Sequence, residues 1–159
     1  MAVCKESYLL KVHVFKVDKP ARSEYGSLVD IYIKRLNSWG VESTFLSSRA
    51  GPDRLEQKVK EKLSKLAKPC LVSLDERGKQ WSSPVLASKL KTWSEDPEVR
   101  NLVFLVGGPY GLGRTILESS KEVWALGSGV FPSDLAWLIL WEQLFRAHSI
   151  NVGSSYHHE

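Results

Sequence analysis

Cysteine is scarce in this sequence, which argues against a fold that depends on disulfides or on cysteine-bound metal ions. Only two cysteines occur among the 159 residues, Cys4 near the N-terminus and Cys70 at the start of an apolar segment. Neither belongs to a Cys-x-x-Cys pair or adjoins a histidine cluster, the patterns typical of redox and zinc sites. We therefore expect buried or incidental thiols, no disulfide and no metal.

Secretory and membrane-spanning segments are also missing. No apolar run near the N-terminus has the flanks of a signal peptide. The most apolar stretch, 134–148, is too short to cross a bilayer and is interrupted by Glu142, Gln143 and Arg146. With 43% hydrophobic and 25% charged residues and no internal repeat, the chain is predicted to form one soluble domain without membrane contact, in the cytosol or an organelle matrix.

The motifs of several common enzyme classes are absent. Segment 107–113 is rich in glycine but lacks the Gly-Lys-Ser/Thr of a phosphate-binding loop, and its Gly-x-x-Gly-x-Gly order runs opposite to the dinucleotide fingerprint. No Gly-x-Ser-x-Gly turn and no His-Glu-x-x-His helix occur. These absences argue against nucleotide hydrolysis and hydride transfer, and against the nucleophile and metal chemistries of the other two motifs.

Charge is distributed unevenly along the chain. Residues 1–68 contain 14 basic and 8 acidic side chains, which gives +6, whereas residues 69–159 contain 8 basic and 10 acidic ones, which gives −2. Segment 53–67 reads as an amphipathic helix, whose leucines and valine fall on one face and whose lysines fall mostly elsewhere. A basic half of this kind suits a polyanion such as RNA, although a solvated lysine-rich helix explains it as well.

The hydrophobic pattern alternates between strand and helix periods. Predicted strands cover residues 10–14, 41–46, 70–74, 101–106 and 123–126, and predicted helices cover 23–37, 53–67, a segment from 83, a short one from 114, and 134–148. Such alternation indicates an α/β domain with a largely parallel sheet, whose ligand should lie outside the carboxyl ends of the strands. Asp75, Gly107 and Gly127 all follow predicted strands.

The last predicted helix, 134–148, is apolar on nearly all sides. A helix of this kind must be buried on both faces, either in a core or between subunits. Its two tryptophans, Trp137 and Trp141, favour a contact between subunits of a dimer.

Two glycine-rich turns and a titratable tail are the candidates for a binding site. Segments 107–113 and 127–132 follow apolar strands, and glycine lets backbone groups approach a flat polar ligand closely. Such glycines also serve simply to cap helices and form corners. The final segment, 156–159, combines an aromatic ring, two imidazoles and a carboxylate, a composition that fits proton transfer or the remnant of a purification tag.

Taken together, these motifs resemble one family. Leu74-Asp75 with Gly78-Lys79, the turn at 107–112, Phe131-Pro132, the run 142–147 and the closing Tyr156-His157 occur in the order and spacing of ribosomal RNA large subunit methyltransferase H. The resemblance covers roughly residues 71–159, and the first seventy residues match in length and element order only.

The resemblance implies a fold and an activity. It implies a SPOUT methyltransferase with a C-terminal trefoil knot, which works as a homodimer and uses S-adenosylmethionine to methylate N3 of a pseudouridine in large-subunit rRNA on the assembled ribosome. The implied cofactor-binding residues are Leu74, Gly107, Gly108, Gly127, Ser128, Gly129, Val130, Phe131 and Pro132. The candidate catalytic residues are Arg146, Tyr156, His157 and His158. A histidine or one of the terminal carboxylates would accept the proton, and Arg146 or Tyr156 would position the RNA.

Some positions depart from the family pattern. Ser133 stands where a histidine is usual, Trp137 where an arginine is usual, and His158 where an arginine is often found, while 17–20 replaces a short glycine-lysine turn. Fewer basic residues weaken binding to phosphates. A different RNA target, or a weakly active RNA- or ribosome-binding protein that keeps the fold, is therefore the alternative function.

Overall fold

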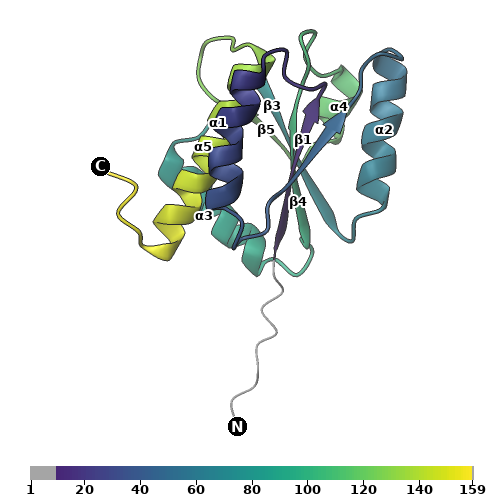
Figure 1. The fold of residues 1–159 in the computed structure, drawn as a ribbon. Coiled ribbons are helices and arrows are strands. Elements are labelled where there is room, and N and C mark those ends of the chain that lie inside the picture. Colours follow the sequence, from purple (N-terminus) through teal and green to yellow (C-terminus); the bar gives the residue numbers. More distant parts are fainter. Residues whose placement is uncertain (1–9, 159) are drawn as a thin grey trace.

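Parallel strands form the centre of the molecule, and helices cover both faces of the sheet (Figure 1). The computed structural model describes residues 10–158. In chain order the elements are β1 (Lys11–Val17), α1 (Ser23–Arg35), β2 (Glu42–Leu46), α2 (Pro52–Ser64), β3 (Pro69–Gln80), α3 (Ser83–Glu95), β4 (Asn101–Val106), α4 (Arg114–Ser119), β5 (Glu122–Ala125) and α5 (Ser133–Val152). This order confirms the predicted alternation, and the fold class is α/β.

The strands lie in the order β2-β1-β4-β3-β5, with every neighbouring pair parallel. The register places Lys16 opposite Val106 and Leu74 opposite Val106, so β1, β4 and β3 end at the same level. On the far side of β3, Leu74 also pairs with Trp124 of β5. The carboxyl ends of four strands therefore meet along one edge of the sheet.

Alternation along β1 supplies two separate cores. Val12 and Val14 face the layer formed by α1, α3 and α5, whereas Phe15 and Val17 face α2 and α4. Every residue of β4 is buried, as expected for a central parallel strand covered on both faces. Lys16 shares the parity of Val12 and Val14, so it points into the layer that contains α5.

The helix α5 is longer than predicted and ends at Val152, where Gly153 adopts φ 73° as a left-handed cap. Trp137 and Trp141 are 3% and 0% exposed and belong to the core against α1 and α3. The interpretation of these tryptophans as dimer contacts is therefore wrong, because the chain itself buries them. The predicted knot stays a prediction.

The strand β3 continues beyond its predicted end at Leu74. Its ladder with β4 stops there, but after a bulge at residues 75–78 the chain pairs with β5 again, Lys79 opposite Trp124 and Gln80 opposite Ala125. Gly78 passes directly over β5, and a Cβ built on it would lie 2.8 Å from the amide nitrogen of Trp124 and overlap the Val123 carbonyl group. Glycine is required here because backbone, not a flexible side chain, occupies the space.

Replacing this glycine tests the packing of the bulge. Gly78→Ala should lower the free energy of unfolding by about 1–3 kcal/mol, because the added methyl group must displace main-chain atoms of β5. Denaturant titration measures the change. The matched control is Gly26→Ala in α1, where nothing lies within 4 Å of the built Cβ. That control should be neutral or stabilising by up to about 1 kcal/mol, since alanine is the better helix former. Equal stabilities for the two variants would contradict the account.

Candidate cofactor cleft

A cleft of about 920 Å³ lies at the edge where the four strands end. Its walls are the turns that follow β1, β3, β4 and β5, together with the first residues of α5. Parallel α/β sheets bind ligands at this edge, because the strands separate into their loops there. The volume is in the range of sites for small molecules and cofactors.

The glycines after β4 shape one wall of the cleft. A Cβ on Gly107 would lie 3.0 Å from the carbonyl carbon of Gly111, and one on Gly108 would lie 3.1 Å from Cγ1 of Val17. Gly111 donates its N–H to the Gly108 carbonyl (2.9 Å) and adopts φ 72°, which closes the turn. The interpretation of this segment as a corner is therefore confirmed for Gly111, and the binding of a ligand by Gly107 and Gly108 stays a prediction.

Most of the residues predicted to bind the cofactor lie together at the cleft. The lining contains Leu74, Gly107, Gly108, Gly127, Gly129, Val130, Phe131 and Pro132, but not Ser128. A built Cβ on Gly127 would lie 3.5 Å from the Phe131 ring, so this turn folds back on itself. Val130 is 79% exposed and Phe131 38% exposed, which leaves apolar surface at the entrance.

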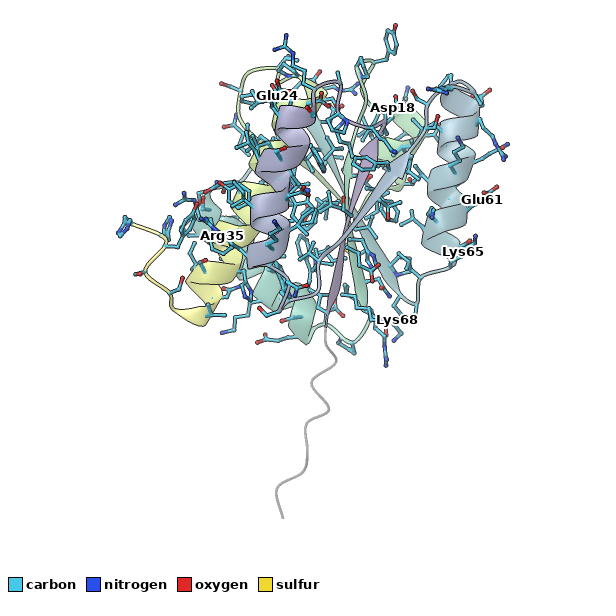
Figure 2. All side chains as sticks on the ribbon, viewed as in Figure 1. Asp18, Glu24, Arg35, Glu61, Lys65 and Lys68 are labelled. Carbon is cyan, nitrogen blue, oxygen red and sulfur yellow. The ribbon has the colours of Figure 1, made fainter. Side chains whose placement is uncertain are left out.

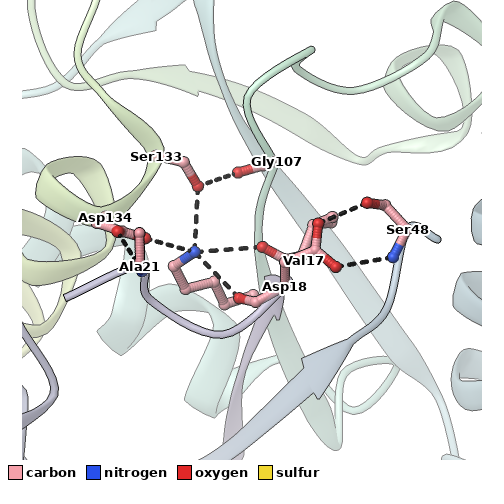
Figure 3. A network of polar contacts seen from close by, with 8 residues as sticks. Val17, Asp18, Ala21, Ser48, Gly107, Ser133 and Asp134 are labelled. Carbon is pink, nitrogen blue, oxygen red and sulfur yellow. Dashed lines mark hydrogen bonds and ion pairs between the residues drawn. The ribbon is translucent and has the colours of Figure 1, made fainter. Parts of the chain in front are cut away.

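A buried ammonium group connects three of the turns around the cleft (Figure 3). Lys16 is 2% exposed, and its Nζ lies 2.9 Å from Oδ1 of Asp134. The same nitrogen donates to the carbonyls of Val17 (3.2 Å) and Asp18 (3.1 Å) and to Oγ of Ser133 (3.3 Å). Ser133 in turn donates its hydroxyl to the Gly107 carbonyl.

Two further contacts extend this network. Oδ2 of Asp134 accepts the Ala21 N–H at 2.9 Å, which fixes the approach to α1. Asp18, at φ 58°, accepts the N–H (2.9 Å) and the hydroxyl (2.5 Å) of Ser48 on the turn after β2. These two bonds hold the pKa of the Asp18 carboxyl below its usual 3.8. The carboxylate therefore stays ionised beside Gly108.

The bulge in β3 supplies the opposite wall. Arg77 grips Asp75 through Nε (2.6 Å) and Nη2 (2.8 Å), and its backbone N–H also donates to Asp75 at 3.0 Å. The Asp75 side chain is 3% exposed, whereas that of Arg77 is 65% exposed. Hydrogen bonds from Arg77 hold the pKa of Asp75 below 3.8 against the opposing effect of burial. The pair thus closes the bulge and leaves the guanidinium at the surface.

The four residues predicted to be catalytic lie elsewhere in the chain. The described lining of the cleft ends at Ala136, so Arg146, Tyr156, His157 and His158 are outside it. Figure 1 shows the C-terminal segment emerging beyond the layer of α1 and α5. Glu159 lies outside the described residues, as does Cys4.

Three of those four residues nevertheless form one cluster, with Arg146 on α5 and Tyr156 and His157 on the segment that follows it. Arg146 pairs with Glu142 (2.6 Å) and lies over the Tyr156 ring, and its Nη1 is 3.3 Å from Nδ1 of His157. The Tyr156 hydroxyl donates to Glu142 at 3.3 Å. Burial raises the pKa of Tyr156, with the Glu142 charge adding to the effect, so this phenol remains protonated at neutral pH. His158 is exposed.

Comparison with known proteins places the chain among methyltransferases. A family model described as "Predicted SPOUT methyltransferase" matches residues 10–157. Ribosomal RNA large subunit methyltransferase H of Zymomonas mobilis is 34% identical over 94% of this chain and 99% of its own length. The enzyme of the same name from Novosphingobium aromaticivorans is 36% identical over 93% and 98%. The chain belongs to the SPOUT methyltransferase family.

Solved structures show the same fold at low identity. A probable methylase family protein from Haemophilus influenzae superposes with a TM-score of 0.60 at 10% identity, over 95% of this chain and 72% of that one. A probable methyltransferase from Bordetella pertussis gives 0.56 at 10% identity, over 88% and 97%. Family and enzyme class are thus confirmed as predicted, and the methyl donor of SPOUT methyltransferases is S-adenosylmethionine.

The cleft fits that cofactor. The Cβ positions of Gly107 and Gly108 are taken by protein atoms of the same turn and of Val17, so glycine lets this turn pack closely where it lines the cleft. Leu74, Leu126 and Phe131 line the cleft beside these glycine turns. Apolar side chains combined with backbone polar groups suit a nucleoside, which has a flat apolar face and polar edges.

Most of the positions expected to depart from the pattern of the resembled family lie close together in space. Ser133 hydrogen-bonds to Lys16, and the Lys16 Nζ lies 6.0 Å from the centre of the Trp137 ring. Segment 17–20, which replaces the glycine-lysine turn, supplies the carbonyls that accept from Lys16. Only His158 lies apart. Ser133, Trp137 and segment 17–20 therefore lie together around the Lys16 ammonium group.

Sequence reasoning missed Lys16, Asp18 and Asp134 at this site. One signal was available, since Lys16 follows Val12 and Val14 on a strand parity that is otherwise apolar. Its partner Asp134 lies in the last helix of the chain, and no local pattern connects them. Within the described residues, no group of three or more histidine, cysteine, aspartate or glutamate side chains could hold a metal ion. Nor does any helix of that part have the length and apolar character to cross a membrane.

The Asp75–Arg77 pair should make stability depend on pH. A carboxyl whose folded pKa is depressed stabilises the fold above its unfolded pKa, and this contribution is lost as the pH falls through the folded value. Asp75→Asn should therefore lower the melting temperature at neutral pH, and the difference from wild type should shrink as the pH falls below 3.8. Glu76→Gln, an exposed carboxylate on the same bulge, is the control and should change little. A deficit that is the same at every pH would contradict the pairing.

Proposed function

We propose that this protein methylates N3 of a pseudouridine or uridine in large-subunit ribosomal RNA, as a homodimer in the cytoplasm or an organelle matrix. The observation that carries the proposal is the cleft itself, where the turns after β3, β4 and β5 present backbone groups at the edge of a parallel sheet. The substrate follows the names of the related enzymes, which act on ribosomal RNA.

The cleft residues have a binding role in this proposal. Leu74 and the turns at 107–108 and 127–132 would hold the cofactor between backbone groups and apolar side chains such as Phe131. When bound, the cofactor supplies a methyl group on a positively charged sulfur. The protein then has to align the nucleophile with that methyl group and provide an acceptor for the N3 proton.

The tail residues are proposed to complete the site of a partner subunit. Arg146, Tyr156 and His157 cluster outside the cleft of their own chain, so they contribute to transfer only if they reach the cleft of a second copy. His157 or His158 would accept the proton, and Arg146 with Tyr156 would position the RNA.

The exposed surface of α1 and α5 supports a dimer of this kind. Leu28 and Ile31 of α1 are 46% and 45% exposed in the single chain. Leu135 and Ile139 of the neighbouring α5 are only partly buried (Figure 1). Apolar side chains that gather on adjacent helices typically mark a protein contact. A second copy packed on this layer would cover them and bring its own tail close.

A complementation experiment tests both the activity and the dimer. Truncation after Gly153 should abolish methyl transfer to ribosomes, whereas S-adenosylmethionine binding measured by calorimetry should persist. Gly108→Val should abolish binding, because the larger side chain meets Val17. Coexpression of the truncated subunit with the Gly108→Val subunit should restore transfer, since the intact tail of one then serves the intact cleft of the other.

Several results would contradict this proposal. Full methylation by the truncated protein would show that the tail is dispensable. Failure of coexpression to restore transfer, with mixed dimers present, would place the tail's action in its own chain. If the wild-type protein binds ribosomes without methylating ribosomes, free rRNA or tRNA, the alternative function as a weakly active binding protein is favoured.

A basic groove beside α2 is the proposed RNA-binding surface. Lys58, Lys62 and Lys65 line a shallow hollow together with Glu61 and residues 45–47 at the end of the edge strand β2. Figure 2 shows Lys65 at the lower end of α2. Three lysines set against one glutamate suit a nucleic-acid backbone, because each ammonium group can neutralise a phosphate.

Removing two of these charges tests the groove. Lys62→Ala/Lys65→Ala should weaken RNA binding and flatten its salt dependence by about 0.7–0.9 in log–log slope for each phosphate that the lysines no longer neutralise. Filter binding over a range of salt concentrations measures both. Lys91→Ala removes an exposed lysine from α3 on the opposite face of the sheet and should leave both unchanged. If Lys91→Ala weakens RNA binding as much, the effect depends on the net charge of the protein and not on this groove.

A further inference from the structure

The ion pair between Lys16 and Asp134 stands out because a cation is buried where a cationic cofactor is proposed to bind. Lys16 lines the cleft with a 2% exposed side chain, and Asp134 lines it with a 17% exposed one. S-adenosylmethionine carries a sulfonium in addition to its amino acid charges. An unbalanced ammonium beside that sulfonium would oppose binding, since like charges in a poorly solvated site repel strongly.

The hydrogen bonds of Lys16 explain why an ammonium group occupies this position despite its repulsion of a sulfonium. Its ammonium joins the end of β1 to the start of α5, and Ser133 passes the connection to the Gly107 carbonyl. Asp134 joins the same point to the Ala21 amide before α1. One side chain thus sets the relative positions of turns on three sides of the cleft (Figure 3). A neutral side chain of similar length could not donate to this set of acceptors.

Asp134 is the group placed to cancel the charge. Its Oδ1 lies 2.9 Å from the Lys16 nitrogen, closer than any of the three oxygens that accept hydrogen bonds from that nitrogen. The remaining charges on the lining balance, with Lys19, Arg22 and Arg77 set against Asp18, Asp75 and Glu76. Loss of either member of the pair would therefore leave one uncompensated charge in the cleft.

We infer that Lys16 and Asp134 form a charge-neutral positioning pair. The lysine holds the cofactor-binding turns in place, and the aspartate cancels its charge so that the cleft does not repel a sulfonium. The inference rests on the proposed cofactor and adds a role for two residues outside the predicted site. The inference predicts an effect on selectivity. A change in the net charge of the pair should alter the affinity for S-adenosylmethionine, which has a cationic sulfur. It should not alter the affinity for S-adenosylhomocysteine, a neutral thioether of nearly the same shape.

Calorimetric titration of both ligands separates charge from geometry. In Asp134→Asn the uncompensated ammonium should weaken S-adenosylmethionine relative to S-adenosylhomocysteine by a factor on the order of ten. In Lys16→Met the uncompensated carboxylate should shift the ratio the other way. The ratio should return to within about twofold of wild type in the double variant Lys16→Met/Asp134→Asn, which is neutral again. It should also stay near wild type in Asp134→Glu, which keeps the charge.

Two controls identify purely structural effects. Ser133→Ala breaks the link to Gly107 without changing any charge, so it should weaken both ligands equally. Glu56→Gln removes a carboxylate from an ion pair with Lys60 on α2, across the sheet, and should leave the ratio unchanged. Thermal unfolding of each variant shows whether it folds. If Asp134→Asn fails to fold, Lys16→Met decides alone, because its expected shift has the opposite sign.

The inference is overturned if the folded single variants bind both ligands with an unchanged ratio, which would make the pair a structural brace only. Wild-type protein that binds neither ligand would overturn the proposed function together with this inference. The two failures are therefore distinguishable in the first titration.

Discussion

The level at which the parallel strands end governs the geometry of the site. Hydrogen bonding sets Lys16, Val106, Leu74 and Trp124 in one row across the sheet. Just beyond this row β1 ends at Val17 and β5 at Ala125, and β3 leaves its ladder with β4, so four turns diverge from nearly one line. The cleft is the space between those turns. A shift of one residue in the pairing of β1 with its neighbours would turn the Lys16 side chain to the other face and separate it from α5.

The position of Lys16 in this row also explains how its charged side chain can be buried. Lys16 lies on the face that the rest of β1 fills with valine, where an unpaired ammonium would be costly. It is stable there because β1 ends, and the freed carbonyls of Val17 and Asp18 are within reach of its nitrogen. The start of α5 completes the set with Ser133 and Asp134. The same atoms that satisfy the lysine also connect the turns.

The outcome of sequence reasoning differed between elements for identifiable reasons. β4 was predicted at its observed bounds, because a strand buried on both faces is continuously apolar. The extent of β3 was missed, since the bulge at 75–78 breaks the local pattern while the second pairing with β5 depends on a remote strand. The tryptophans of α5 were misassigned because periodicity measures how apolar a helix is and not which body buries it.

The sequence by itself determined the α/β class, the family and the turns that line the cleft, because these follow from local periodicity, glycine placement and the order of short motifs. Only the tertiary structure decided that Lys16, Asp134 and the departing residues Ser133 and Trp137 share one corner. It also separated the cluster of Arg146, Tyr156 and His157 from the cleft of their own chain. Both outcomes depend on how distant segments dock, and side-chain partners far apart in the chain leave no local signature.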